Sequence, residues 1–300
     1  MTPTTTTSDG LPASPLLRLP LELRLMIYEY LLFPSTHPTT GSGTSIANLL
    51  PDFHTYYSAD TNNDPFTLSV RTIDPWLGGQ PKSWRRRSTY YVRTGAFLTS
   101  STPTTYRILL SPYTAHLRHT IPSLLSLNHQ IHAEATKTFY ATYTFSFHTA
   151  IEAIVPFLTD LTPLARQSVR TLHFTKKVLP YTKEFDRAEW ARACAFLGAG
   201  GMQGLRCVHL GVVVGRPATG WEGVGMISSA GFEELVRVRR GGVDLEWVEQ
   251  VLAIGGLGEV RVEALVERCA VPVSETMAFW VAFSRGVVEG GFVGLRVLCR

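Results

Sequence analysis

Charged residues are scarce in this chain of 300 amino acids, at 17% against the roughly 25% that is usual in soluble domains. Even so, no uninterrupted apolar run approaches the roughly 20 residues that a membrane-spanning helix requires, which argues against a membrane span. The formal net charge is only +4, from 28 basic and 24 acidic residues. This mild basic excess does not indicate a nucleic-acid-binding protein.

Cysteines are few and lie far apart, at positions 194, 207, 269 and 299. They form no C-x-x-C pair and no dense framework of the kind that small secreted domains use. The first ten residues also lack the basic start and apolar block of a secretory signal. We therefore expect reduced thiols and a cytoplasmic or nuclear location.

The apolar content nevertheless predicts a folded protein. Apolar residues make up 45% of the chain and aromatic residues 11%, which is enough for the core of one large or two modest domains. Shifts in composition divide the chain into four parts. We expect a polar, disordered tail at 1–15, a helix within 16–33, a loop-rich insertion at 34–121 and an ordered part at 122–300.

The clearest helix runs from Pro20 to Leu32. Pro20 stands where a first helical turn tolerates proline, and no breaker follows until Pro34. Apolar side chains point in nearly every direction around its axis, which is typical of a helix that is buried on more than one side. We expect one stripe to pack on the protein's own core, namely Leu23, Ile27, Tyr30 and Leu31. Other apolar residues then remain for a second surface, namely Leu19, Pro20, Leu21 and Leu25.

Strands and helices alternate in the second half of the chain. Helical spacing within 122–140 is followed by short strand patterns at 143–147, 169–174, 205–214, 260–265 and 295–298, and by helical stretches at 150–160, 186–197, 230–254 and 274–289. Two more short strands are expected in the insertion, at 66–73 and 90–98. Strands joined through helices favour a parallel sheet, either an open α/β layer or a curved repeat array. The spacing is irregular for a strict leucine-rich repeat, so both alternatives stay open.

Two separated segments carry a family resemblance. Residues 19–31 read L-P-x-E-L-R-x-x-I-Y-x-x-L, which resembles the opening helix of F-box domains. The same segment is similar to the start of a group of ascomycete fungal proteins of unknown function. Residues 124–147, with L-L-S-L-N-H-Q-I-H-A-E-A followed by F-Y and Y-T-F-S-F, resemble a second segment of that group. The chain departs from an ordinary F-box because some 90 residues separate the two segments.

The resemblance implies an F-box-like helical N-terminal segment, and the strand and helix pattern adds a C-terminal layer of alternating strands and helices. Together they predict an α+β chain, whose C-terminal layer a degenerate leucine-rich-repeat-like array would also fit. An F-box helix docks on Skp1, the adaptor subunit of a cullin ubiquitin ligase. By this resemblance the Skp1-contacting surface would include Leu19, Pro20, Glu22, Ile27 and Leu31. The remaining layer would then capture a target protein.

No constellation in the sequence points to catalysis. His129, His132 and Glu134 lie close together, but H-x-x-H lacks the spacing and internal glutamate of a zinc peptidase helix. The glycine clusters at 198–204 and 255–258 precede strands, whereas a dinucleotide fold needs glycines after a strand, so they are expected to be turns. The basic run at 82–87 is expected to be a solvated loop.

We therefore predict a protein-interaction module that is not an enzyme and holds no metal or cofactor. Its predicted role is substrate recruitment to a Skp1-cullin ubiquitin ligase. The alternative is a fungal protein-binding or structural domain with no ubiquitin role, in which the first helix belongs to the internal core.

Overall fold

The computed structural model describes residues 14–36, 64–73, 86–91, 103–110, 113–178, 184–238 and 245–290. Residues 1–13 of the predicted tail, most of the insertion, Cys299 and the strand predicted at 295–298 lie outside these ranges. Among the described helices, none is both long and apolar enough to cross a membrane.

Seven strands form one mixed sheet in the order β2-β3-β1-β4-β5-β6-β7. β1, β4, β5, β6 and β7 are parallel to one another. At one edge, β3 lies between β1 and β2 and is antiparallel to both. A mixed α/β fold with a parallel sheet is thus confirmed. The strand bounds are β1 Thr67–Ile73, β2 Arg86–Tyr91, β3 Pro103–Leu109, β4 Thr144–His148, β5 Thr171–Lys177, β6 Cys207–Pro217 and β7 Glu259–Cys269.

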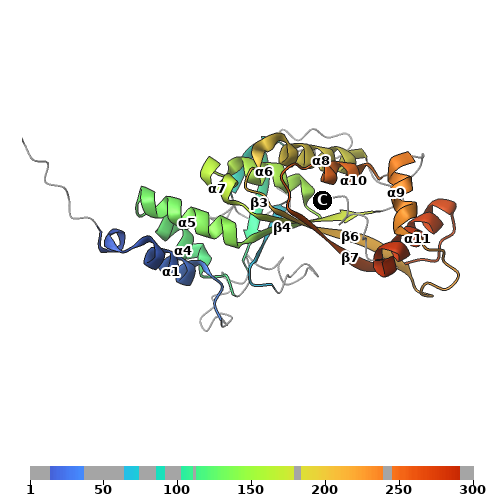
Figure 1. Cartoon of the computed structure of the whole chain (residues 1–300), viewed down its shortest axis with the longest axis horizontal. Helices are drawn as coiled ribbons and strands as arrows, with labels where there is room; N and C mark the ends of the chain where they lie inside the picture. The colour runs from blue at the N-terminus through green and yellow to red at the C-terminus, as the bar shows by residue number, and fades with distance from the viewer. Residues whose placement is uncertain are drawn as a thin grey trace, which may run out of the picture.

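From β4 to β7 the spatial order of the strands follows their order in the chain. Because parallel crossovers are right-handed, connections that all step in one direction place their helices on the same face of the sheet. Figure 1 shows α6, α8 and α10 together above the sheet. The helices that follow β4 are η3 Ile151–Ala153, α6 Ile154–Asp160, α7 Pro163–Ser168, α8 Glu184–Phe196, η4 Leu197–Gly201, α9 Ser229–Val238, α10 Glu246–Leu252 and α11 Glu275–Gly290.

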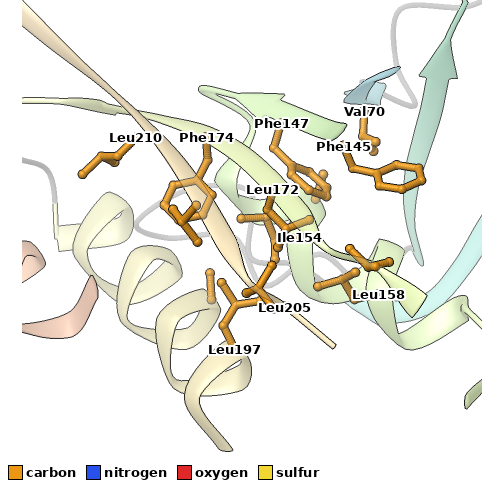
Figure 2. Packing of buried hydrophobic residues seen from close by; sticks show 14 of the residues in the cluster. Val70, Phe145, Phe147, Ile154, Leu158, Leu172, Phe174, Leu197, Leu205 and Leu210 are labelled. Carbon is orange, nitrogen blue, oxygen red and sulfur yellow. The ribbon is translucent and has the colours of Figure 1, made fainter. Parts of the chain in front are cut away.

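The main core lies between the sheet and this helical layer. Figure 2 shows strand residues packing against helix residues, with Phe145, Leu172 and Phe174 opposite Ile154 and Leu158. The alternate residues of the same strands are polar, such as Ser146 on β4 and His173 on β5. The sheet therefore has an apolar face under the helices and a polar face on the other side.

Helix α11 packs on that other face, near the ends of β6 and β7 (Figure 1). The Ser284 hydroxyl accepts a hydrogen bond from the Gly215 backbone N–H at 3.0 Å. The Trp280 ring lies directly over Gly215, where a side chain on β6 would overlap it. Gly215 is therefore the position that lets this helix approach the sheet.

Three further helices form a unit beyond one end of the sheet, at the left of Figure 1. They are α1 Leu21–Leu32, α4 Leu117–Leu125 and α5 His129–Thr142, and a short 3₁₀ turn, η1 Pro15–Arg18, precedes α1. The Asn128 side chain caps α5 by accepting a hydrogen bond from the Gln130 backbone N–H at 2.7 Å. The two segments with the family resemblance therefore lie side by side, although the chain between them supplies three strands of the sheet.

Candidate protein-interaction surface

Helix α1 packs inward through a stripe that the sequence did not predict. Its buried residues are Arg24, Tyr28 and Leu32, which lie four residues apart along one side. The predicted core stripe was wrong for Tyr30, whose side chain is 88% exposed, and for Leu23, which is 46% exposed. An arginine takes a core position because a carboxylate from a distant part of the chain meets it there.

That carboxylate belongs to Glu134 on α5. The Arg24 guanidinium donates to both of its oxygens, from Nε to Oε2 at 2.9 Å and from Nη2 to Oε1 at 2.8 Å. The Tyr28 hydroxyl donates to the same Oε2 at 2.9 Å, and Gln130 Nε2 donates to Oε1 at 3.0 Å. The third arginine nitrogen, Nη1, donates to the Leu19 carbonyl at 2.6 Å. Bidentate pairs of this kind fix orientation as well as distance.

These contacts join the two family-like segments. Arg24 and Tyr28 belong to the first segment, and Gln130 and Glu134 belong to the second. At the other end of α1, the Tyr143 hydroxyl donates to the Leu32 carbonyl at 2.6 Å. Both ends of α1 are thus tied to the α5–β4 region, so the helix is held in one orientation.

The electrostatics of this link favour the ionised carboxylate. Hydrogen bonds from Arg24 lower the pKa of Glu134 to about 2. Burial, together with the hydrogen bond to Glu134, raises the pKa of Tyr28 to about 12. At neutral pH the link therefore consists of a charged arginine, a charged glutamate and a neutral tyrosine.

This link predicts a pH-dependent contribution to stability. A carboxylate whose pKa is lower in the folded state stabilises the fold above its unfolded pKa, near 4.5, and loses that contribution as the pH falls toward 2. We expect Glu134→Gln to lower the free energy of unfolding at pH 7 by about 2 kcal/mol, because solvent partly screens the pair. Urea unfolding of both proteins from pH 7 to pH 2 measures this, and the difference should disappear at the acid end.

The matched control is Glu29→Gln, which makes the same chemical change at an exposed carboxylate on α1. It should leave the unfolding curves nearly unchanged. A constant difference between Glu134→Gln and the unaltered protein across the whole pH range would contradict this prediction.

The opposite side of α1 carries large apolar residues that face solvent. Leu23, Met26 and Tyr30 are 46%, 63% and 88% exposed. Their spacing of three, four and seven residues places them on one stripe of the helix. Leu21, in the first turn, is 45% exposed, and Leu127, in the turn between α4 and α5, is 63% exposed. We call Leu23, Met26 and Tyr30 the outer stripe of α1.

The residues predicted for Skp1 contact occupy different environments. Pro20 and Glu22 are exposed, at the start of α1, while Leu19 and Ile27 are half-buried. Leu31 is half-buried and packs against the core. The structure therefore places Pro20, Glu22 and Ile27 around the outer stripe and turns Leu31 toward the protein interior.

The outer stripe could have been recognised from the sequence only with knowledge of the buried side. Leu23, Met26, Ile27 and Tyr30 follow a helical spacing, but so do the residues on the inner side. Hydrophobicity alone does not distinguish the two sides of a helix that is apolar all round.

The histidine and glycine motifs that the sequence analysis set aside as chemical sites have structural roles. His132 Nδ1 donates to the Leu125 carbonyl at 2.9 Å, and Glu134 binds Arg24. The glycine cluster at 198–204 forms the turn after α8, as predicted, with Gly200 in the left-handed region at φ 77°. Of the basic run, the structure describes only the backbone of Arg86 and Arg87, in β2.

A row of histidines on the polar face of the sheet was missed. His173 is in register with Ser146 and His209, and its Nδ1 lies 2.8 Å from the Ser146 hydroxyl. Burial lowers the pKa of His173 to about 4, so the imidazole is neutral at physiological pH. Across the described ranges, no three or more histidine, cysteine or acidic side chains are grouped so that they could hold a metal ion.

Comparison of the chain with protein-family models, with curated proteins and with solved structures finds no significant match. The resemblance to F-box proteins therefore rests on the residues of the two segments, and the functional argument rests on the geometry of α1.

Proposed function

We propose that the protein is a non-enzymatic interaction module that acts as an F-box-like adaptor, with α1 docking on Skp1 of a cullin ubiquitin ligase. The observation that carries the proposal is the outer stripe of α1, because Leu23, Met26 and Tyr30 are exposed on a helix that is fixed from its other side. Soluble proteins rarely expose adjacent large apolar residues without a partner.

The geometry suits helix recognition. An apolar stripe with residues at i, i+3 and i+7 is the surface that a helix presents to a hydrophobic groove. The Arg24–Glu134 link keeps the helix oriented before the partner arrives, which reduces the entropy lost on binding. Pro20 and Glu22 flank the stripe at the first turn, where the family resemblance predicts partner contact.

The sheet supports the second half of the proposal, a target-binding layer. Strands β4 to β7 follow chain order and carry their connecting helices on one face, as a repeat-like array would. A target protein would then contact the polar face of the sheet, on which His173 and His209 are half-buried.

A second candidate function is supported by the path of the chain between α1 and α4. An ordinary F-box closes its helices within a few residues, whereas here β1, β2 and β3 intervene and join the sheet. In this alternative the outer stripe binds a protein unrelated to ubiquitin ligases.

The test is direct binding of the purified full chain to purified Skp1 by isothermal titration calorimetry. We expect Tyr30→Asp and Met26→Asp each to weaken binding by about 30-fold, as loss of a central interface residue does. Val273→Asp is the matched control, because it places the same charge on a residue that is 94% exposed and lies outside α1. Its affinity should be unchanged.

Failure of the folded protein to bind Skp1 would reject the adaptor role. Affinity purification from a filamentous fungus with the unaltered and Tyr30→Asp proteins then separates the two candidates. A protein retained only by the unaltered chain, in the absence of Skp1 and cullin, would favour the second.

A further inference from the structure

The sheet ends at a long, regular edge strand. β7 spans eleven residues and pairs in parallel with β6 along its whole length, without a register shift. It is the outermost strand in the sheet order, so within the described residues its second edge has no neighbouring strand. Backbone N–H and C=O groups along such an edge are available for pairing with another chain.

β7 lacks several features that commonly protect an edge strand. It has no proline, it is longer than most strands, and it carries no bulge. Val266 is 48% exposed although it points toward the helix-covered face. The charged residues of β7 are also exposed, including Arg261 and Glu259, which form a 2.8 Å ion pair with side chains 60% and 52% exposed. Exposed pairs of this kind contribute little to stability, so Arg261 can change partner at small cost.

The sequence of β7 is complementary to itself when two copies run antiparallel. With a two-fold axis through Ala264, Arg261 lies opposite Glu267 of the second copy, and this pair occurs twice. The same axis places Val262 opposite Val266, also twice. In the described part of a single chain, Glu267 forms no ion pair.

The hydrogen-bond pattern restricts where the axis can lie. In a parallel pair, every second residue of a strand directs its backbone N–H and C=O groups toward the partner, and the residues between direct theirs toward the free edge. In an antiparallel dimer, the residues whose groups point to the free edge must lie opposite the same set in the second copy. The axis must therefore pass through a residue. Moving it to Glu263 or Leu265 places a glutamate opposite Glu267, which is repulsive. An axis at Ala264 keeps all eleven residues in register, places Arg261 opposite Glu267 twice and brings no two like charges opposite each other.

We propose that β7 is a homodimer interface, in which a second copy of this chain pairs antiparallel with it about a two-fold axis at Ala264. The two sheets then form one continuous sheet, with the exposed Val266 covered by Val262 of the second copy. Because β7 runs in opposite directions in the two copies, the helical units that carry α1 lie at opposite ends of the assembly. This inference does not depend on the proposed function.

The test is the oligomeric state of the full chain, measured by sedimentation velocity over a range of concentrations. We expect a dimer for the unaltered protein. Arg261→Glu and Glu267→Arg should each raise the dimer dissociation constant at least tenfold, because each places like charges opposite one another twice. The double variant Arg261→Glu/Glu267→Arg should restore the dimer, since the charge pairs reform with their signs exchanged.

Arg268→Glu is the matched control. It makes the same change of charge on the same strand, but the proposed register places it opposite Val260. It should dimerise like the unaltered protein, and circular dichroism checks that every variant is folded.

Several results would overturn the proposal. A monomer at all concentrations would do so, as would a dimer that the single charge changes do not affect or that the double variant does not restore. A chain that dimerises only after removal of residues 291–300 would show that this segment of the same chain occupies the edge. Pairing with an unrelated protein in place of a second copy would equally reject it.

Discussion

Replacing Phe145 with alanine is expected to lower the free energy of unfolding by about 4 kcal/mol, the usual cost of truncating a fully buried phenylalanine. The Phe145 side chain is 0% exposed. Its ring lies 5.5 Å from Tyr140 on α5 and 5.3 Å from Phe157 on α6, measured between ring centroids. It therefore connects the N-terminal helical unit, the sheet and the helical layer in one cluster.

A loss of this size is a large part of the 5 to 15 kcal/mol that holds a typical domain together. We expect the Phe145→Ala midpoint in urea to fall sharply, and Phe145→Leu to lose much less because most of the volume remains. Val271→Ala, which truncates a side chain that is 54% exposed, is the control. A Phe145→Ala protein with a nearly unchanged midpoint would show that the aromatic cluster is not the core of the fold.

Gly204→Ala is expected to be nearly as damaging although it adds a single methyl group. A Cβ atom at Gly204 would lie 2.7 Å from the Gln167 carbonyl carbon and would overlap its oxygen. The Gly204 carbonyl also accepts a hydrogen bond from Arg170 Nη1 at 2.8 Å. The Gln167 carbonyl belongs to the backbone, which cannot rotate away as a side chain can, so the segment before β6 must move away from α7.

We expect this substitution to cost about 3 kcal/mol, at the upper end of overpacking effects. Gly255→Ala makes the same chemical change in the turn before β7, where nothing lies within 4 Å of the added atom. Thermal unfolding of the two variants compares them directly. Equal melting temperatures would mean that the approach of Gly204 to α7 does not constrain the fold.

The sequence predicted most of the parallel sheet because its strands carry a strong local signal. β4, β5 and β6 alternate or concentrate apolar residues and lie between helices with helical spacing, and all three were predicted within a few residues. β3 was missed, because Pro103 and the threonines after it resemble a loop. Pairing with β1 decides its conformation, and no local pattern carries that information.

The helices show the same limit. The helical stretch predicted at 230–254 holds two helices, α9 and α10. The predicted helical region at 122–140 is likewise divided at Asn128, where the capped start of α5 follows the end of α4. At Asn128 the break depends on a side-chain cap, which a periodic pattern of apolar residues does not reveal.

The sequence identified the helix but not its exposed side. It expected Leu19, Pro20, Leu21 and Leu25 on the free side, whereas Leu25 packs against the core and Tyr30, expected in the core, is exposed. The orientation depends on Arg24 meeting Glu134, which is 110 residues away in the chain. A contact of that separation leaves no trace in the periodicity of either helix.

The same separation has a consequence during synthesis of the protein. Glu134 emerges from the ribosome on the order of 5 to 20 s after Arg24, at ordinary translation rates. Throughout that interval α1 has neither its ionic partner nor the cover of α5, so both of its apolar sides are open to water. The newly made N-terminus can therefore bury the inner side of α1 in its final packing only after α5 has been translated.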